Sequence, residues 1–500
     1  MNTNPREISR TLFPRLNCRS FLDDSSYADQ ILTLVRQGVG GFVLFEGHVD
    51  DAARTIDMLR GESGPFPLLF AADCEFGLTM RFEGGVEYPD MWTWGSADDP
   101  ELTRRAASEI GLEMRRCGID WNFAPVVDVN TNPANPIVNV RAFGEDPERV
   151  AVHGAAYVQG MQQSGVIACA KHFPGHGDTE VDSHIGLPVL PFDRGRLEAV
   201  EFPPFRAAMQ AGVLSVMSSH LAVPLLDHSG DPASLSRPIV TGVLREELGF
   251  DGVVVTDALD MGAIVEHYGT EEAVVRAFLA GNDVLEIPAD PFSALEGLGR
   301  AVENGRISRE QIARSLCRID RLLEFRQEHQ ANSPVSEMGA LDSAAALLAE
   351  KGIVVGGEIP RLDEMEDTPA VLILHDERAE RSAGHLQKNL ERMFGAQVWN
   401  MSVETSADST RKAATVQAVV EAGKNLILVL MIRPRGGAGS VSIGPEGEKL
   451  LRSINLSGTA VLNFGNPYLL RDLATVWRVD AFSASVPSVD AVLALLKTKK

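Results

Sequence analysis

The sequence has few cysteines, and their positions exclude two kinds of site. Only five occur among 500 residues, and none stands in a CxxC pair. An odd, scattered set argues against a disulfide framework, and the lack of close pairs argues against a thiolate zinc site. The cysteine pattern therefore fits a protein of a reducing compartment.

Long apolar runs are also absent from the sequence. No stretch reaches the roughly 20 apolar residues that a membrane-spanning helix needs, and the mean hydropathy is −0.02. The first residues, MNTNPREISRTLFPRLNCRS, contain arginines but neither the apolar core nor the small-residue cleavage site of a secretory signal. We therefore expect a cytoplasmic protein that does not contact a membrane.

Positive charge is scarce. Lysine and arginine number 46 against 69 aspartates and glutamates, which gives a net charge of −23, and the sole basic run is the terminal KTKK. Such a chain repels phosphate backbones and anionic lipid surfaces. Nucleic acid is therefore not an expected partner.

Eight short apolar runs, rich in β-branched residues, alternate with helix-compatible segments through about residue 330. The predicted strands are residues 11–17, 40–47, 68–75, 119–128, 166–173, 214–221, 252–259 and 283–288. Apolar runs without strict alternation are typical of parallel strands covered on both faces. Eight strand–helix units over about 300 residues predict an α/β fold, a (β/α)8 barrel of the TIM type.

The pattern restarts after a polar stretch. A helix-like segment at 344–355 leads into five further candidate strands at 369–377, 396–403, 425–434, 458–467 and 479–485. These predict a second, smaller α/β domain with an open, sandwich-like sheet. We expect a barrel domain over residues 1–330, a linker over 331–345 and a C-terminal α/β domain over 346–500.

Polar residues close most of the barrel's predicted strands. They are Asp73 and Glu75, Asp128, Lys171 and His172, His220, and Asp257. Active sites of such barrels collect at the carboxyl ends of the strands. Each residue alone is explained equally well by the start of a solvated loop, but together they predict a site at that end.

The segment KHFPGHGDTEVDSH, residues 171–184, is the densest polar stretch. His172 and His176 are four residues apart, which on a helix would place two metal ligands on one face, but Pro174 and Gly175 deny the segment that helix. A metal site is therefore disfavoured, although a loop could still gather ligands around an ion.

Asp182 and His184, at the end of this segment, form an Asp-Ser-His sequence. Residues two apart in an extended segment project the same way, so the carboxylate can hold the imidazole and raise its basicity. The alternative is a surface pair without a role. A proton carrier is the better interpretation only if a reaction partner exists.

Asp257 is the candidate partner, because it follows the apolar run GVVV and one threonine. A carboxylate at the barrel mouth and an acid/base on a loop are the two groups of a retaining glycosidase. The alternative for Asp257 is the N-cap of the next helix.

The sequence also contains four segments that together resemble a known family: KHFPGHGDTEVDSH, GFDGVVVTDALDM, FAPVVDVN and VRAFGEDP. They are similar to the signature segments of glycoside hydrolase family 3, specifically its β-N-acetylhexosaminidase branch. The resemblance covers most of the barrel. The later FGNPYLL and AFSASVPSVDAV resemble the second domain of longer members.

The resemblance implies a role for each matching residue. Asp257 corresponds to the catalytic nucleophile, and His184 to the acid/base, assisted by Asp182. The implied sugar contacts are Asp73, Arg81, Arg141, Lys171 and His172. One segment departs from the family pattern: where members often read DQEGGRV, this chain reads DCEFGLTMRF. The resemblance therefore does not extend to the fine specificity of peptidoglycan-recycling members.

The resemblance further implies an exo-acting retaining hydrolase that removes terminal β-linked N-acetylglucosamine through a glycosyl-aspartate, without metal or cofactor. The expected substrate is a small oligosaccharide, either a muropeptide fragment or a chito-oligosaccharide. The implied process is peptidoglycan recycling or other carbohydrate metabolism. The expected oligomeric state is a monomer or a homodimer. The alternatives are a β-glucosidase, a β-xylosidase or a glycoside phosphorylase of the same family, and a sugar-binding protein without catalysis.

Overall fold

The computed structural model describes residues 5–64, 66–180, 186–332, 342–362, 368–403, 426–433 and 458–498, with isolated positions between 414 and 456. The chain divides into two compact units. The first comprises Met1–Val86, Pro100–Asn132 and Glu145–Leu341, and the second comprises Glu87–Asp99, Pro133–Gly144 and Asp342–Lys500.

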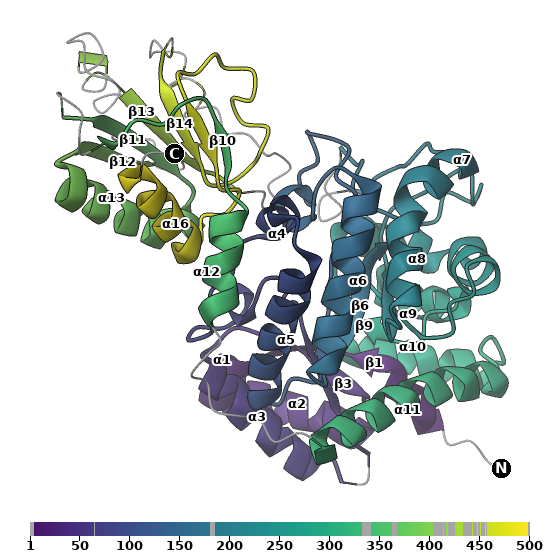
Figure 1. The fold of residues 1–500 in the computed structure, drawn as a ribbon. Helices are drawn as coiled ribbons and strands as arrows, with labels where there is room; N and C mark the ends of the chain where they lie inside the picture. The colour runs from purple at the N-terminus through teal and green to yellow at the C-terminus, as the bar shows by residue number, and fades with distance from the viewer. Residues whose placement is uncertain are drawn as a thin grey trace. The chain divides into compact units, whose positions relative to one another are not determined.

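The strands of the first unit are all short and parallel (Figure 1). They are β1 Leu12–Phe13, β2 Arg15–Asn17, β3 Gly41–Phe45, β4 Leu69–Ala72, β5 Trp121–Asn122, β6 Ile167–Phe173, β7 Ser215–Ser218, β8 Val253–Thr256 and β9 Leu285–Glu286. β2 to β8 form one sheet in sequence order, and β1 pairs with β9. A bridge between Val255 and Val284 joins β8 to the residue before β9, so the ring closes.

The eight predicted strand positions of the barrel are confirmed, with two differences caused by proline. Pro14 separates β1 from β2 within the first predicted strand. In the fourth, the regular strand stops at Asn122, and pairing resumes only as a bridge between Val126 and Lys171. Pro125 lies between them, and proline has no N–H to donate to the ladder.

Helices follow the strands and cover the outside of the barrel. The regular ones are α1 Cys18–Asp23, α2 Ser25–Gln37, α3 Val49–Glu62, α5 Pro100–Arg116, α6 Pro147–Gln163, α8 Phe202–Gln210, α9 Gly262–Ala280, α10 Pro291–Glu303 and α11 Arg309–Asn332. The 3-10 and π-helical segments and one three-residue α-helical turn are η1 Pro5–Thr11, η2 Leu78–Met80, α7 Arg194–Arg196, η4 Leu197–Glu201, η5 Ala233–Leu235 and η6 Pro238–Glu247. Figure 1 shows α5, α6 and α8 side by side on the outer face of the sheet.

Local sequence explains where these helices begin and end. The Asp24 side chain caps α2 by accepting from the backbone N–H groups of Ser26 and Tyr27, and Gly38, at φ 86°, ends it. Asp146 caps α6 in the same way, with Pro147 at the first helical position. Aspartate before a helix satisfies its free N–H groups, and glycine adopts the left-handed conformation that ends one.

The second unit is built on a six-stranded sheet in the order β10-β15-β14-β13-β11-β12. Its strands are β10 Val354–Gly356, β11 Ala370–His375, β12 Gln397–Ser402, β13 Leu426–Met431, β14 Ala460–Asn463 and β15 Arg478–Asp480. Its helices are α4 Met91–Ala97, η3 Asn139–Arg141, α12 Asp342–Lys351, η8 Glu377–Ala379, α13 Glu380–Phe394 and α16 Val486–Lys497. Apolar side chains of α13 and α16 pack against those of the sheet, and Figure 1 shows the two helices on the same face of it.

Five strands of this sheet were expected, and β10 is an addition. The helix predicted for residues 344–355 stops at Lys351, because Gly352 follows, and Val354 and Val355 enter an edge strand antiparallel to β15. The sheet is therefore mixed. Helix also occupies both ends of the predicted linker 331–345, since α11 runs to Asn332 and α12 begins at Asp342.

Two segments from the first third of the chain belong to the second unit's packing. Trp92 and Val140 form a small apolar cluster with Phe482, and the hydroxyl of Thr93 donates to the carbonyl of Ala481 at 2.8 Å. No helix within the described ranges combines the length and apolar character that crossing a membrane requires.

Candidate active site

The barrel interior changes from apolar to polar at the carboxyl ends of its strands. Strand residues alternate between the interior and the helix-facing side, and the interior core includes Leu69 and Ala71, Ile167 and Cys169, Val253 and Val255, and Val284. The same alternation places the next side chains in the layer above the core: Asp73, Lys171, Asp257 and Glu286. The candidate site is this layer and the loops around it.

Lys171 joins the third and fifth strand positions of the site. Its ammonium lies 2.7 Å from Asp73 Oδ1 and 2.8 Å from Glu75 Oε1, and its side chain is 2% exposed. Arg81 Nη2 donates to the other oxygen of Asp73 at 2.9 Å. Burial acts to raise the pKa of Asp73, but the charges of Lys171 and Arg81 outweigh it, so this pKa is lowered. Asp73 is therefore an ionised acceptor held between two cations.

Asp128 organises the start of the loop that follows β6. One of its oxygens lies 2.7 Å from His172 Nδ1, and the other accepts the backbone N–H groups of His172 at 3.1 Å and His176 at 2.7 Å. His176 is buried and lies 2.8 Å from the Thr179 hydroxyl. Burial, with the neighbouring His172, lowers the pKa of His176 to about 4. His176 is therefore a neutral structural residue of this loop.

Asp257 lies directly after β8, with its backbone N–H bonded to the Ser218 carbonyl of β7 at 2.9 Å. Its Oδ1 accepts from the Ala258 N–H at 2.8 Å. Burial acts to raise the pKa of Asp257, but His172 and His220 outweigh it and lower the pKa. The N-cap alternative is wrong, because α9 begins at Gly262 with Met261 as its N-cap residue. Asp257 is thus an ionised carboxylate in the polar layer.

His220 and Asp260 flank Asp257. His220 is buried, with its two ring nitrogens 2.7 Å from the Ser234 hydroxyl and 2.9 Å from the Ala258 carbonyl. Asp260 accepts from Arg15 Nη2 at 2.9 Å. Both side chains have structural partners, which leaves Asp257 as the carboxylate of this loop that faces the polar layer.

Two of the predicted residues fall outside the described part of the chain, and a third is grouped with the second unit. Asp182 and His184 fall in residues 181–185, outside the part of the chain that the structure describes. Arg141 ends η3 in the second unit, where its Nη1 donates to the Ile137 carbonyl at 3.1 Å. The structure therefore brings together Asp73, Arg81, Lys171, His172 and Asp257.

The structure also adds Glu75 and Asp128, which were placed at strand ends but given no role in the site, and Glu286, which was not predicted there. Glu75 and Asp128 each close a predicted strand, so polarity at a strand end was a usable signal. Glu286 lies inside the run DVLEIP, and only the alternation set by its neighbour Val284 places it in the polar layer. Within the described residues, no group of three or more His, Cys, Asp or Glu side chains is arranged as metal ligands.

The polar layer predicts a pH dependence of stability. Both Asp73 and Asp128 have lowered pKa values in the folded chain, so they contribute stability above the unfolded pKa of about 4 that is lost as the pH falls below it. We expect the urea unfolding free energy to drop between pH 6 and pH 3. In Asp73→Asn, this drop should shrink by about 1 kcal/mol, because a carboxyl with an unfolded pKa near 4 can lose no more than that between pH 6 and pH 3.

The exposed carboxylate of Asp50 supplies the control for this measurement. Asp50→Asn should leave the drop between pH 6 and pH 3 as in the unchanged chain, because that side chain is 84% exposed. An unchanged drop in Asp73→Asn would contradict the assignment of Asp73 as an ion-paired group.

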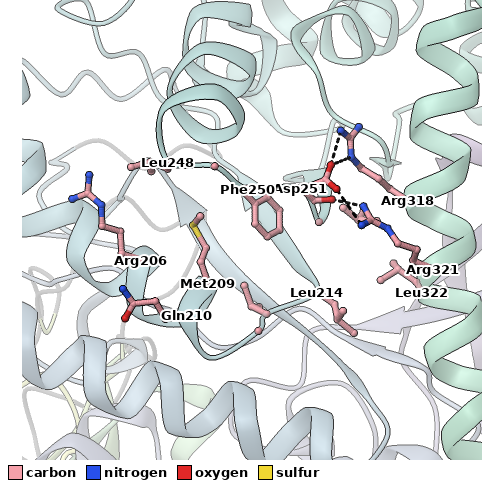
Figure 2. Close-up of a pocket in the computed structure, with 15 residues that line it drawn as sticks. Arg206, Met209, Gln210, Leu214, Leu248, Phe250, Asp251, Arg318, Arg321 and Leu322 are labelled. Atoms are coloured by element: carbon pink, nitrogen blue, oxygen red, sulfur yellow. Dashed lines mark hydrogen bonds and ion pairs between the residues drawn. The ribbon is translucent and has the colours of Figure 1, made fainter.

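A large cavity of about 550 Å³ lies at the other end of the barrel (Figure 2). Its lining includes Leu214 and Val253, which precede or begin β7 and β8. Figure 2 shows the ion pairs of Arg318 and Arg321 with Asp251. Arg206 pairs with Glu198, which does not line the cavity. Because it lies at the amino ends of the strands and its charges are paired, this cavity is not the candidate active site.

Comparisons with known proteins show the family of this chain. Residues 25–322 match the model of the glycosyl hydrolase family 3 N terminal domain. The chain is 33% identical over 370 residues to "Beta-hexosaminidase A" of Pseudoalteromonas piscicida, covering 66% of this chain and 62% of that relative's length. It is 28% identical over 493 residues to "Beta-N-acetylglucosaminidase/beta-glucosidase" of Cellulomonas fimi, covering 92% and 86%.

A solved structure with the same fold covers nearly the whole chain. It is a glycoside hydrolase family 3 β-N-acetylglucosaminidase from Paenibacillus sp. str. FPU-7, with a TM-score of 0.83, 28% identity and coverage of 99% of this chain and 97% of that one. The two-part architecture is therefore shared with a solved relative.

Proposed function

Because the chain belongs to glycosyl hydrolase family 3, we propose that it is an exo-acting retaining β-N-acetylglucosaminidase. The observation that carries the proposal is Asp257, an ionised carboxylate at the barrel mouth, in the same layer as the Asp73–Lys171 pair. A nucleophile must be deprotonated and must face the anomeric carbon of a sugar held nearby.

In the first step, Asp257 attacks the anomeric carbon of the terminal sugar, and the glycosidic C–O bond breaks. His184 gives its proton to the departing oxygen, with Asp182 holding the imidazole. The product is a covalent glycosyl ester of Asp257. In the second step, His184 takes a proton from water, the water oxygen attacks the same carbon, and Asp257 is released. Two displacements retain the configuration.

The sugar is proposed to be held by ionised groups of the polar layer. Asp73 would accept from sugar hydroxyls, with Lys171 beside it and Arg81 fixing the carboxylate. His172, which is held by Asp128, is proposed as a further contact by resemblance. Charged hydrogen bonds to hydroxyls are strong in a site that excludes most water. Arg141 is proposed as a further contact from the segment VRAFGEDP, by resemblance alone.

The proposed substrates are small oligosaccharides with terminal β-linked N-acetylglucosamine, either muropeptide fragments or chito-oligosaccharides, in the cytoplasm. All five cysteines are free thiols, four of them buried, which supports a reducing compartment. A β-glucosidase is the second candidate, because one relative's name joins both activities. Phosphorolysis is a further alternative, since a histidine acid/base that has lost its proton is neutral and does not repel phosphate.

The test compares aryl β-N-acetylglucosaminide with aryl β-glucoside, each with and without phosphate and EDTA. We expect a higher kcat/KM on the N-acetylglucosaminide, release of free sugar rather than sugar 1-phosphate, and no effect of EDTA. An equal or higher kcat/KM on the glucoside would contradict the N-acetylglucosaminidase assignment, and sugar 1-phosphate as the main product would contradict hydrolysis.

A further inference from the structure

Glu286 is a buried carboxyl in the polar layer that the mechanism above does not use. It ends β9 and is 3% exposed. Its backbone N–H donates to the Thr256 hydroxyl at 3.1 Å, and its carbonyl accepts from Leu259 at 3.1 Å. Glu286 is therefore fixed on the strand next to the one that presents Asp257.

The Glu286 carboxyl has an unusual environment. Its Oε2 is buried without a hydrogen-bond partner, and a buried polar atom left unpaired is costly. Burial, together with the negative charges of Asp73 and Asp257, raises the pKa of Glu286 well above its usual value, and the charge of Lys171 opposes the shift only in part. The side chain is therefore a neutral acid that can donate a hydrogen bond.

The other acidic groups of the layer cannot replace this donor. Asp73 and Asp257 have lowered pKa values and act as acceptors. The Lys171 ammonium has three N–H donors, and Asp73 and Glu75 engage two of them. Among the acidic side chains Asp73, Asp257 and Glu286, Glu286 is the one suited to an oxygen that accepts hydrogen bonds and has none to give.

We propose that Glu286 is a specificity-determining residue that donates a hydrogen bond to the carbonyl oxygen of the terminal sugar's 2-acetamido group. The inference rests on the proposed function. Asp257 attacks C1, the acetamido group is on C2, and Glu286 stands on the neighbouring strand, so donor and acceptor lie on the same side of the site. An amide carbonyl accepts but does not donate, whereas the 2-hydroxyl of a glucoside does both and has less need of this donor.

The test measures the ratio of kcat/KM for aryl β-N-acetylglucosaminide to kcat/KM for aryl β-glucoside in four variants. Glu286→Met keeps the length of the side chain but cannot donate, so the ratio should fall about five- to tenfold, as expected for one lost neutral hydrogen bond. Glu286→Asp withdraws the carboxyl by one methylene and should lower the ratio similarly. Glu286→Gln keeps a neutral donor and should stay within about twofold of the unchanged chain.

Glu113→Gln serves as the matched control, because Glu113 is also a buried glutamate but lies near the end of α5. It should leave the ratio unchanged. The inference is overturned if folded Glu286→Met or Glu286→Asp keeps the original ratio of the two kcat/KM values. This includes an equal fall of kcat/KM on both substrates, which is what a purely structural role predicts. Should the methionine variant fail to fold in a thermal melt, the aspartate variant decides. A preference of the unchanged chain for the glucoside would instead overturn the proposed function, independently of the variants.

Discussion

Replacing Asp257 by alanine is expected to lower kcat on aryl β-N-acetylglucosaminide by about 10⁴-fold or more, the scale of losing a nucleophile. The reason is that no other described carboxylate beside it is free to attack: Asp260 is bonded to Arg15, and Asp73 is held between Lys171 and Arg81. Initial rates and a pre-steady-state measurement of the first aryl alcohol released are the readouts.

Azide identifies the role of the missing group. In Asp257→Ala, azide entering the vacated space attacks C1 from the nucleophile's side and gives the α-glycosyl azide. In His184→Ala the glycosyl-Asp257 ester still forms, so azide attacks from the opposite side and gives the β-glycosyl azide. Asp260→Asn is the control and should keep activity within about threefold, since an exposed ion pair contributes little. Near-normal turnover in Asp257→Ala would show that the nucleophile is another residue.

Replacing Lys171 by methionine is expected to produce the largest loss of stability in the site. The change leaves the buried Glu75 and the partly buried Asp73 without the ammonium between them. Removing one partner of a buried ionic group lowers the unfolding free energy by about 3–5 kcal/mol. Urea unfolding at pH 7 measures this, and kcat/KM should also fall about 10–100-fold through the lost charged contact.

Two further variants test whether the loss of the buried ion pair causes this loss of stability. Lys351→Met removes an ammonium that pairs with Asp99 at the surface, with 50% of the lysine side chain exposed, and should cost about 0–1 kcal/mol. The double variant Lys171→Met with Glu75→Gln removes one of the stranded charges and should recover part of the stability. A loss in Lys171→Met no greater than in Lys351→Met would mean that the buried pair is not a stabilising group.

Polarity at strand ends explains why much of the site was predictable from the sequence. Asp73, Lys171 and Asp257 each follow an apolar run, and parallel strands bring such positions to one edge. Asp182 and His184 were indicated by their spacing in the sequence, and the resemblance of their segment then implied their roles. The roles of all five remain predictions that the experiments above test.

Three features could not be predicted from the sequence, because they depend on strand register, on long-range packing or on a very short strand. Glu286 is flanked by apolar residues, and its inward direction depends on the bridge between Val255 and Val284 that closes the ring. The grouping of Arg141 with the second unit depends on Val140 meeting Phe482, more than 300 positions away. The edge strand at Val354 is too short to be distinguished from the end of a helical pattern.

The cluster of Trp92, Val140 and Phe482 bears on how such a chain can be cut and recombined. A gene truncated between α11 and α12 would deliver a polypeptide that still carries Glu87–Asp99 and Pro133–Gly144, two pieces of the other unit's core, with their apolar partners missing. The C-terminal fragment would lack the same pieces. A cut between α11 and α12 therefore separates residues that pack together within the second unit.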